Sequence, residues 1–132
     1  MKHIKTIHLN DTDAAGVVYF ASLLSLCHEV YEDSLLLAKI NIKSFLGSGE
    51  LALPIVHAEI DFKKPIFCGD KIDIYLSPEV LSETSFAVNY QVCFSDTLIT
   101  TATAKTIHVC IDFPDKKSRT LPKSLLSWIG KS

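Results

Sequence analysis

Two carboxylates, Asp11 and Asp13, stand in a short polar loop directly before a long apolar segment. Apolar residues in that segment recur at helical spacing, which predicts a helix from about Val17 to Ala38. Its first two turns are apolar on almost every side, and such a helix is expected to be buried. A carboxylate beside a helix N-terminus suits acyl chemistry, because it can act as general base or nucleophile while unpaired N–H groups stabilise an oxyanion.

The polar loop also has a purely structural interpretation. Asp11 and Asp13 belong to a residue type that commonly caps a helix or shapes a loop through side-chain hydrogen bonds. Gly16 suits a loop position that requires a positive φ angle. Considered as isolated residues, the two carboxylates remain open to a catalytic role and to a capping role.

The order of residues across the loop and the helix start is similar to a known family signature. The segment DTDAAGVVYFAS resembles the pattern D-x-D-x-x-G-[IV]-V-[YW] of the 4-hydroxybenzoyl-CoA thioesterase family of hotdog-fold proteins. The resemblance implies that Asp13 is the catalytic carboxylate and that an antiparallel sheet wraps around one long central helix. It also implies that Gly16, Tyr19 and Phe20 bind substrate, with the backbone N–H near Phe20 donating to the thioester oxygen. By apolar character alone, the residues at positions 19 and 20 are instead expected in the core.

Several other segments resemble one subgroup of that family, whose members hydrolyse 1,4-dihydroxy-2-naphthoyl-CoA. They are CHEVYE within the helix (Cys27–Glu32), LPIVHAEIDFKKPIFCGDKI (Leu53–Ile72), HVCI (His108–Ile111) and LPKSLLSWI near the end. The resemblance implies an aromatic acyl-CoA substrate, on the route to phylloquinone or menaquinone. It includes His57, which is interpreted either as a surface or interface histidine or as a residue that a dimer contributes to the acyl pocket.

Length and composition indicate one domain, residues 1–132, with 48% hydrophobic residues available for a core. A net charge of −2 gives no electrostatic case for nucleic-acid binding. No secretory signal pattern is visible, and Ser22, Ser25 and His28 interrupt the longest apolar run, so a cytoplasmic protein without a membrane span is expected. The four cysteines form no CxxC motif and are expected to be reduced and buried, with no metal or redox cofactor.

Beyond the helix, the apolar period changes to an alternation that predicts strands. The predicted elements are strands over 2–9, 56–62, 71–76, 85–94 and 98–111, a loop with one helical turn over 41–50, and a terminal helix over 123–129. Short connections predict antiparallel neighbours, so the expected fold class is α+β. The apolar phase of the strand at 56–62 includes Phe62, and its polar phase includes His57, Glu59 and Asp61.

Two groups of charged residues have alternative interpretations. Glu29, in the middle of the long helix, is interpreted as structural, because the signature places the catalytic carboxylate in the loop. Lys116, Lys117 and Arg119 form a small basic cluster that is either a solvated face or a contact for the phosphates of coenzyme A.

A single sheet on one helix leaves an edge and a face uncovered, so a homo-oligomer is expected, specifically a tetramer built from dimers. The resemblance also implies active sites between two subunits. Two alternatives to the aromatic acyl-CoA hydrolase remain: a general acyl-CoA thioesterase acting on aliphatic chains, and a non-catalytic hotdog module that binds acyl groups. Asp13 argues against the second alternative, since a module that only binds does not need that carboxylate.

Overall fold

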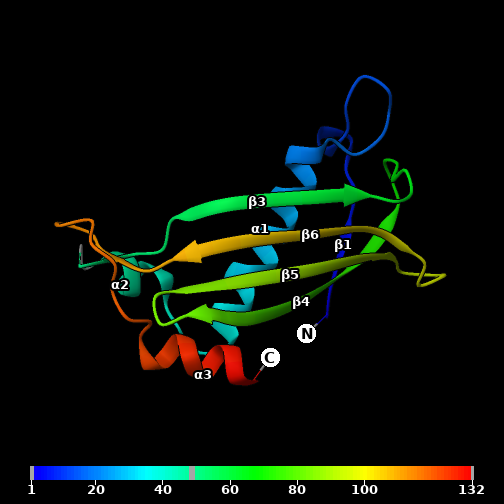
Figure 1. The fold of residues 1–132 in the computed structure, drawn as a ribbon. Helices are drawn as coiled ribbons and strands as arrows, with labels where there is room; N and C mark the ends of the chain where they lie inside the picture. The colour runs from blue at the N-terminus through cyan, green and yellow to red at the C-terminus, as the bar shows by residue number, and fades with distance from the viewer. Residues whose placement is uncertain (1, 48–49, 132) are drawn as a thin grey trace.

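A five-stranded antiparallel sheet lies against one long helix in the computed structural model of the chain, which describes residues 2–47 and 50–131 (Figure 1). The strand order is β1-β4-β5-β6-β3. The strands are β1 (Lys2–Thr6), β3 (Ile55–Phe62), β4 (Lys71–Ser82), β5 (Ser85–Phe94) and β6 (Thr100–Val109), and a small second sheet pairs β2 (Leu51–Ala52) with β7 (Ile111–Asp112). The helices are α1 (Phe20–Leu37), α2 (Ile42–Gly47) and α3 (Lys123–Lys131). The predicted α+β class is confirmed.

Alternating apolar residues on β5 form the centre of the core. Phe86, Val88, Tyr90 and Val92 are each at most 3% exposed. On α1 the buried side chains recur at helical spacing: Leu23, Cys27, Val30, Tyr31, Ser34 and Leu35. Full burial of a large apolar side chain stabilises a protein by about 1.5–3 kcal/mol. The contact between α1 and the inner face of the sheet therefore holds the helix in place.

The long helix begins at Phe20 rather than at the predicted Val17. Val17 and Val18 are extended instead: Val17 bridges to Phe67, and Val18 donates its N–H to the carbonyl of Ile66 at 2.7 Å. The loop after β3 thus pairs with backbone that a continuous helix would have used. β-branched valines suit this extended conformation.

The first turn of α1 passes beyond the edge strand β3, as Figure 1 shows. Tyr19 is 46% exposed and Phe20 is 51% exposed, whereas Leu23 is fully buried at 0%. The expectation that the first two turns are buried is therefore wrong for the first turn, because the sheet does not extend under it. It follows that positions 19 and 20 lie outside the core.

Two predicted strands are longer than the observed ones. β1 ends at Thr6 because residues Leu9–Asp11 form a 3-10 turn, η1. β6 begins at Thr100 because Leu98, within the turn before it, has a positive φ of 60°. Both corrections concern the ends of strands: the observed β1 lacks the last three residues of the predicted strand, and β6 lacks two residues at each end.

The segment over 41–50 was predicted as a loop with one helical turn, and it contains the six-residue helix α2; Ser48 and Gly49 lie outside the described residues. The expectation about the cysteines is modified. All four cysteines are free, but Cys68 is exposed while the other three are buried. Cys68 lies in the loop between β3 and β4, whose Ile66 is buried in the core while Cys68 itself is not.

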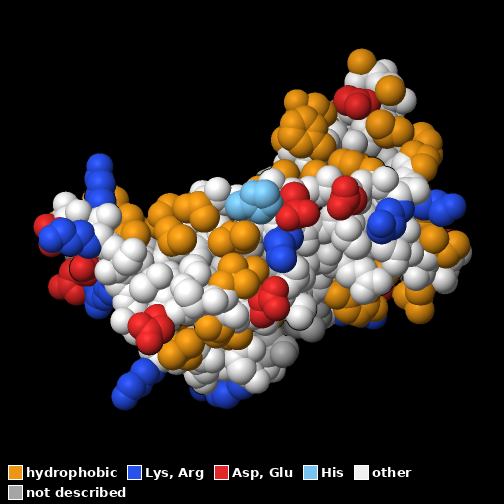
Figure 2. All heavy atoms as spheres, viewed as in Figure 1, with side chains coloured by type: hydrophobic (Ala, Val, Ile, Leu, Met, Phe, Trp, Pro, Cys, Tyr) orange, Lys and Arg blue, Asp and Glu red, His pale blue; other side chains and the backbone are white. Residues whose placement is uncertain are grey.

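β3 is an edge strand that α1 leaves largely uncovered. Every residue of β3 except Ile60 is exposed, including Val56 at 60% and Phe62 at 44%. β3 pairs with β6 on one side only. Its other side, together with the exposed start of α1, forms one open margin of the molecule, where Figure 2 shows hydrophobic side chains gathered.

Candidate active site

The loop that carries Asp13 is a tight turn closed by hydrogen bonds between its own backbone groups. The N–H of Asp13 donates to the carbonyl of Val17 at 2.9 Å, and the N–H of Gly16 donates to the carbonyl of Asp13 at 3.0 Å. Thr12 and Val18 form an antiparallel bridge that closes the turn. Gly16 has a φ of +83°, a backbone conformation that residues other than glycine rarely adopt. The turn therefore depends on glycine for its backbone shape.

Asp13 is exposed, and its carboxylate is held by the turn. Its Oδ1 accepts the N–H of Ala15 at 2.8 Å. The side chain lines a cavity of about 480 Å³ whose wall is otherwise made by the start of α1 and the segment after β3. The lining residues are Asp13, Val17, Val18, Tyr19, Phe20 and Phe62 to Ile66. The carboxylate of Asp13 thus lies at a largely apolar hollow of a size typical for small-molecule sites.

The N-terminus of α1 opens onto the same cavity. Tyr19 is the N-cap residue, and the N–H of Leu23 makes the first intrahelical bond to the Tyr19 carbonyl at 3.1 Å. The N–H groups of Phe20, Ala21 and Ser22 therefore lack intrahelical acceptors, and they carry the partial positive charge of the helix N-terminus. An oxygen that gains negative charge near Phe20 is stabilised there.

Aromatic side chains form the walls of the cavity. The ring centroids of Tyr19 and Phe20 lie 4.8 Å apart, with an angle of 52° between the planes. Phe62, at the end of β3, contributes a third ring from the other side of the cavity. Flat apolar walls of this kind suit a flat aromatic group.

Asp11 has a structural role in the loop and, unlike Asp13, does not line the cavity. Its Oδ2 accepts the N–H of His8 at 2.9 Å, which closes the η1 turn. Its backbone carbonyl accepts the N–H of Tyr19 at 2.8 Å. Asp11 therefore ties the loop to the start of α1, and it does not line the cavity.

His57 does not join Asp13 within one chain. It shares the outer face of β3 with Glu59, and its Nε2 lies 3.0 Å from Glu59 Oε1. The inner face of β3, which carries Ile60 and Phe62, is the one turned toward α1. His57 is thus placed on the side of the sheet opposite to the cavity.

The other charged candidates also lie away from the cavity. Glu29 Oε2 pairs with Lys5 Nζ at 3.3 Å, beside β1. The loop that carries Lys116, Lys117 and Arg119 lies at the opposite end of the sheet from the Asp13 loop (Figure 1). Arg119 Nη1 pairs there with Asp112 Oδ1 at 3.4 Å.

Sequence reasoning did not assign Phe62, Lys63, Lys64 and Pro65 to the site. The alternating pattern placed Phe62 in the apolar phase of its strand, and this ring is 44% exposed at the edge of the sheet. Lys63 to Pro65 directly follow the predicted strand over 56–62, and no role was predicted for them. The available signal was the segment Leu53–Ile72, which carries part of the subgroup resemblance and contains all four residues.

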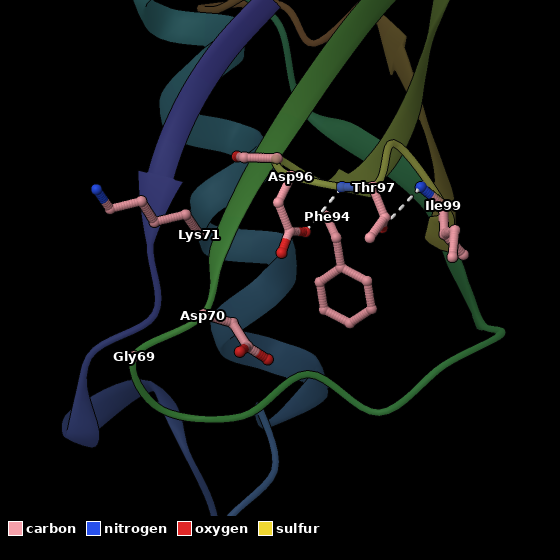
Figure 3. Close-up of a pocket in the computed structure, with 8 residues that line it drawn as sticks. Gly69, Asp70, Lys71, Phe94, Asp96, Thr97 and Ile99 are labelled. Atoms are coloured by element: carbon pink, nitrogen blue, oxygen red, sulfur yellow. Dashed lines mark hydrogen bonds between the residues drawn. The ribbon is translucent and has the colours of Figure 1, made fainter.

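A second hollow of about 670 Å³ lies on the other side of the loop after β3 (Figure 3). Its lining includes the carboxylates Asp70 and Asp96, which accept backbone N–H groups of Phe67 and Thr97 at 2.8 Å each. The Phe94 ring points into it, whereas Lys71 points away. These contacts shape two turns, and neither a helix N-terminus nor Asp13 faces this hollow.

The described residues contain neither a cluster of metal ligands nor a membrane-spanning helix. Within residues 2–47 and 50–131, no group of three or more His, Cys, Asp or Glu side chains is arranged to hold a metal ion. In the same part of the chain, no helix is long and apolar enough to cross a membrane.

A sequence profile of the thioesterase-like superfamily matches residues 7–129. The chain belongs to this superfamily. The thioesterase is 50% identical to a 1,4-dihydroxy-2-naphthoyl-CoA hydrolase of Crocosphaera subtropica, over 98% of this chain and 95% of the relative. It is 51% identical to a protein of the same name from Rippkaea orientalis, over 96% and 93% of the two chains.

Solved structures agree with this membership. The thioesterase superposes on the crystal structure of a 1,4-dihydroxy-2-naphthoyl-CoA thioesterase from Synechocystis with a TM-score of 0.94. The two are 36% identical, and the match covers 98% of this chain and 94% of the other. The hotdog fold predicted from the DTDAAGVVY signature is confirmed.

Proposed function

We propose that this thioesterase hydrolyses 1,4-dihydroxy-2-naphthoyl-CoA to 1,4-dihydroxy-2-naphthoate and coenzyme A, a step toward phylloquinone or menaquinone. The observation that carries the proposal is that Asp13, the N-terminus of α1 and three aromatic rings line one cavity. The names of the relatives with 50% and 51% identity support the choice of substrate.

Asp13 is the catalytic carboxylate in this proposal. It either attacks the thioester carbon and forms an anhydride that water then hydrolyses, or it removes a proton from an attacking water. Both routes place negative charge on the thioester oxygen, and the N–H groups at Phe20 and Ala21 stabilise that charge. The thiolate of coenzyme A leaves when the tetrahedral intermediate collapses. One turnover in ¹⁸O-labelled water, followed by mass spectrometry of the peptide containing Asp13, tests for the anhydride. Label in the carboxylate shows the anhydride route with water attacking the carbonyl carbon of Asp13, because a general base gains no label.

Tyr19, Phe20 and Phe62 form the slot for the aromatic acyl group. Gly16 contributes indirectly, because the shape of the turn that presents Asp13 depends on it. A panel of acyl-CoA substrates, followed by thiol release, tests this function. We expect kcat/KM for the naphthoyl thioester to exceed that for straight-chain thioesters at least tenfold, as a purely apolar slot discriminates by roughly 10–200-fold. Equal rates would instead favour a general acyl-CoA thioesterase, and no turnover of any thioester would favour a binding module.

The same proposal includes a homo-oligomer, a tetramer built from dimers. It is supported by the open margin of β3, where the strand has a free edge and exposed apolar residues such as Ile55 at 42% and Val56 at 60%. A second copy that pairs along β3 covers this edge and brings its own β3 close to the exposed start of α1. Light scattering at micromolar concentration tests it, and a monomeric mass would contradict it. A cytoplasmic location belongs to the proposal as well, since free cysteines are typical of a reducing compartment.

A further inference from the structure

The proposed function leaves the nucleotide half of the substrate unassigned. Coenzyme A carries a diphosphate and a 3′-phosphate, so its binding site needs cations. The sequence offers two basic groups, Lys63 with Lys64, and Lys116 with Lys117 and Arg119. These groups lie at opposite ends of the sheet in one chain (Figure 1). Only Lys63 and Lys64 line the cavity that contains Asp13.

We propose that Lys63 and Lys64 bind the phosphates of coenzyme A and thereby select a CoA thioester over a thioester that lacks phosphates. This inference rests on the proposed thioesterase function and extends it to a part of the substrate that Asp13 does not touch. The two lysines hold the substrate in position, and they take no part in bond breaking.

The backbone at this position is fixed, while the two side chains are exposed to solvent. The N–H groups of Lys63 and Lys64 both donate to the carbonyl of Thr101, at 2.8 and 3.1 Å. Pro65 follows directly and restricts the backbone of Lys64 to extended conformations. β6 and the proline therefore hold both Cα atoms at the rim of the cavity.

The ammonium groups of both lysines are available for an anion. Among the described residues, the ion pairs within 4.0 Å join other cations to carboxylates: Lys2, Lys5, Arg119 and four histidines. Lysine binds phosphate as a point charge on a flexible stem, so two adjacent lysines can follow a diphosphate as it leaves the cavity. In a chain of net charge −2, such a local excess of positive charge also attracts an anionic substrate.

Two hollows adjoin the loop after β3, and the charges of their lining residues make one of them better suited to phosphate. The hollow on its other side carries the carboxylates Asp70 and Asp96, which repel an anion, and Lys71 points away from it (Figure 3). Lys63 and Lys64, by contrast, line the same cavity as Asp13 and Phe62. The pantetheine arm is thus expected to run from Asp13 outward past Phe62 toward the two lysines.

The test compares two thioesters of the same acyl group, one on coenzyme A and one on pantetheine. We expect the double variant Lys63→Gln/Lys64→Gln to lower the ratio of kcat/KM for the CoA thioester to that for the pantetheine thioester at least tenfold, with the loss in KM rather than kcat. The variant Lys63→Arg/Lys64→Arg should restore most of the ratio. Raising the ionic strength should reduce the ratio in the unmodified enzyme and change it little in the glutamine variant.

The matched control is Lys116→Gln/Lys117→Gln, which removes the same charge at the far end of the sheet. We expect it to leave the ratio unchanged. If the ratio of kcat/KM for the CoA thioester to that for the pantetheine thioester fell in this control and not in the Lys63 and Lys64 variant, the proposal would be overturned. The phosphates would then be assigned to the other basic cluster. An equal loss on both thioesters in the Lys63 and Lys64 variant would also overturn it, because it would indicate a packing role.

Direct binding separates this inference from the proposed function. Titration calorimetry with free coenzyme A and with pantetheine measures the phosphate contribution without turnover. If no thioester is hydrolysed, the thioesterase proposal fails, yet weaker coenzyme A binding in Lys63→Gln/Lys64→Gln would still support the lysine site. Unchanged coenzyme A binding in that variant would refute it. Dephospho-CoA, which lacks only the 3′-phosphate, then shows which phosphate the lysines bind.

Discussion

The N-terminal and C-terminal halves of α1 both carry aromatic side chains, and the surroundings of these side chains differ. At the C-terminal end, Tyr31 is 5% exposed and its ring lies 4.8 Å from His108 and 5.8 Å from Trp128, measured between centroids. At the N-terminal end, Tyr19 and Phe20 are about half exposed and lie beside Asp13. An aromatic residue on this helix is therefore a core residue only where another element covers it.

The cover at the C-terminal end comes from elements distant in sequence. Trp128 of α3 donates its Nε1–H to Ser34 Oγ at 2.7 Å, and both are buried. His108 of β6 stacks on Phe86 at 4.7 Å with an interplanar angle of 5°. Among the described residues, no element covers Tyr19 and Phe20 in this way, because the sheet ends at β3. The difference indicates that the aromatic residue Tyr31 serves stability, whereas Tyr19 and Phe20 are free to contact a substrate.

The largest effect that we expect from a change at the open end is on chemistry. Asp13→Asn should lower kcat at least a hundredfold while the fold remains intact, because the amide is nearly isosteric but neither a base nor a good nucleophile. Circular dichroism checks that the fold is intact, and a thiol-release assay measures kcat. Asp11→Asn is the control, with a much smaller effect expected, since Asp11 holds the η1 turn. If the change at Asp11 were the more damaging, the roles assigned to the two carboxylates would be reversed.

A pair of truncations tests the contrast in stability directly. Leu23→Ala removes a fully buried side chain and should lower the free energy of unfolding by about 2–5 kcal/mol. Phe20→Ala removes a larger side chain that is 51% exposed, and should cost about 1 kcal/mol or less while raising KM. Urea unfolding measures the free energy of unfolding of both variants. Equal losses of stability at the two positions would contradict the view that the open end is not part of the core.

The buried end should also respond to pH. Burial lowers the pKa of His108 from 6.5 to about 4, with the nearby His28 a smaller cause. In the unfolded chain this histidine binds a proton below about pH 6.5, whereas in the folded protein it stays neutral until about pH 4. Its contribution to stability is therefore complete above pH 6.5, falls as the pH decreases toward 4, and then stays level. Between pH 7.5 and 5 the loss from this one group is about 2 kcal/mol.

The matched variant for this pH effect is His108→Gln. Glutamine can keep a hydrogen bond to Thr106 Oγ1, which lies 2.9 Å from His108 Nε2, but it does not titrate. The variant should start with lower stability at pH 7.5 and lose less of it on acidification than the unmodified protein. Identical pH dependence in the two proteins, measured by urea unfolding, would show that His108 is not the group responsible.

The contrast between the two ends also explains what the sequence could predict. Alternation on β5 and helical spacing on α1 indicated the sheet and the helix, because burial on one face repeats with a fixed period. The Asp13 turn was recognisable because its carboxylate, Gly16 and the following apolar run are adjacent in sequence. These features are local, so a single sequence contains them.

The features that were not predictable depend on contacts between distant segments. Val17 and Val18 suit a helix by pattern, but they pair with Phe67 and Ile66, far along the chain. Phe62 belongs to the apolar phase of β3, and only the position of α1 across the sheet shows that this ring lies beyond the core. Periodicity shows which face of a helix or strand is apolar. It does not show where the element that packs against this face ends.

The smallest effect that we expect concerns His57, on the outer face of β3 and away from the cavity of its own chain. If the protein forms a dimer paired along β3, as proposed above, we expect His57 to approach the partner's acyl pocket and to hydrogen-bond a hydroxyl of the naphthoyl group. His57→Ala should then lower kcat/KM for the naphthoyl thioester about tenfold and for straight-chain thioesters by less than twofold, because only the first substrate has a hydroxyl to pair. His28→Ala, which changes another partly exposed histidine, on α1, is the control. Mixing Asp13→Asn chains with His57→Ala chains sharpens the test, since a mixed dimer contains one site with both residues intact. Activity of the mixture above the average of the two parents would support a contact between subunits, and activity equal to that average would contradict it.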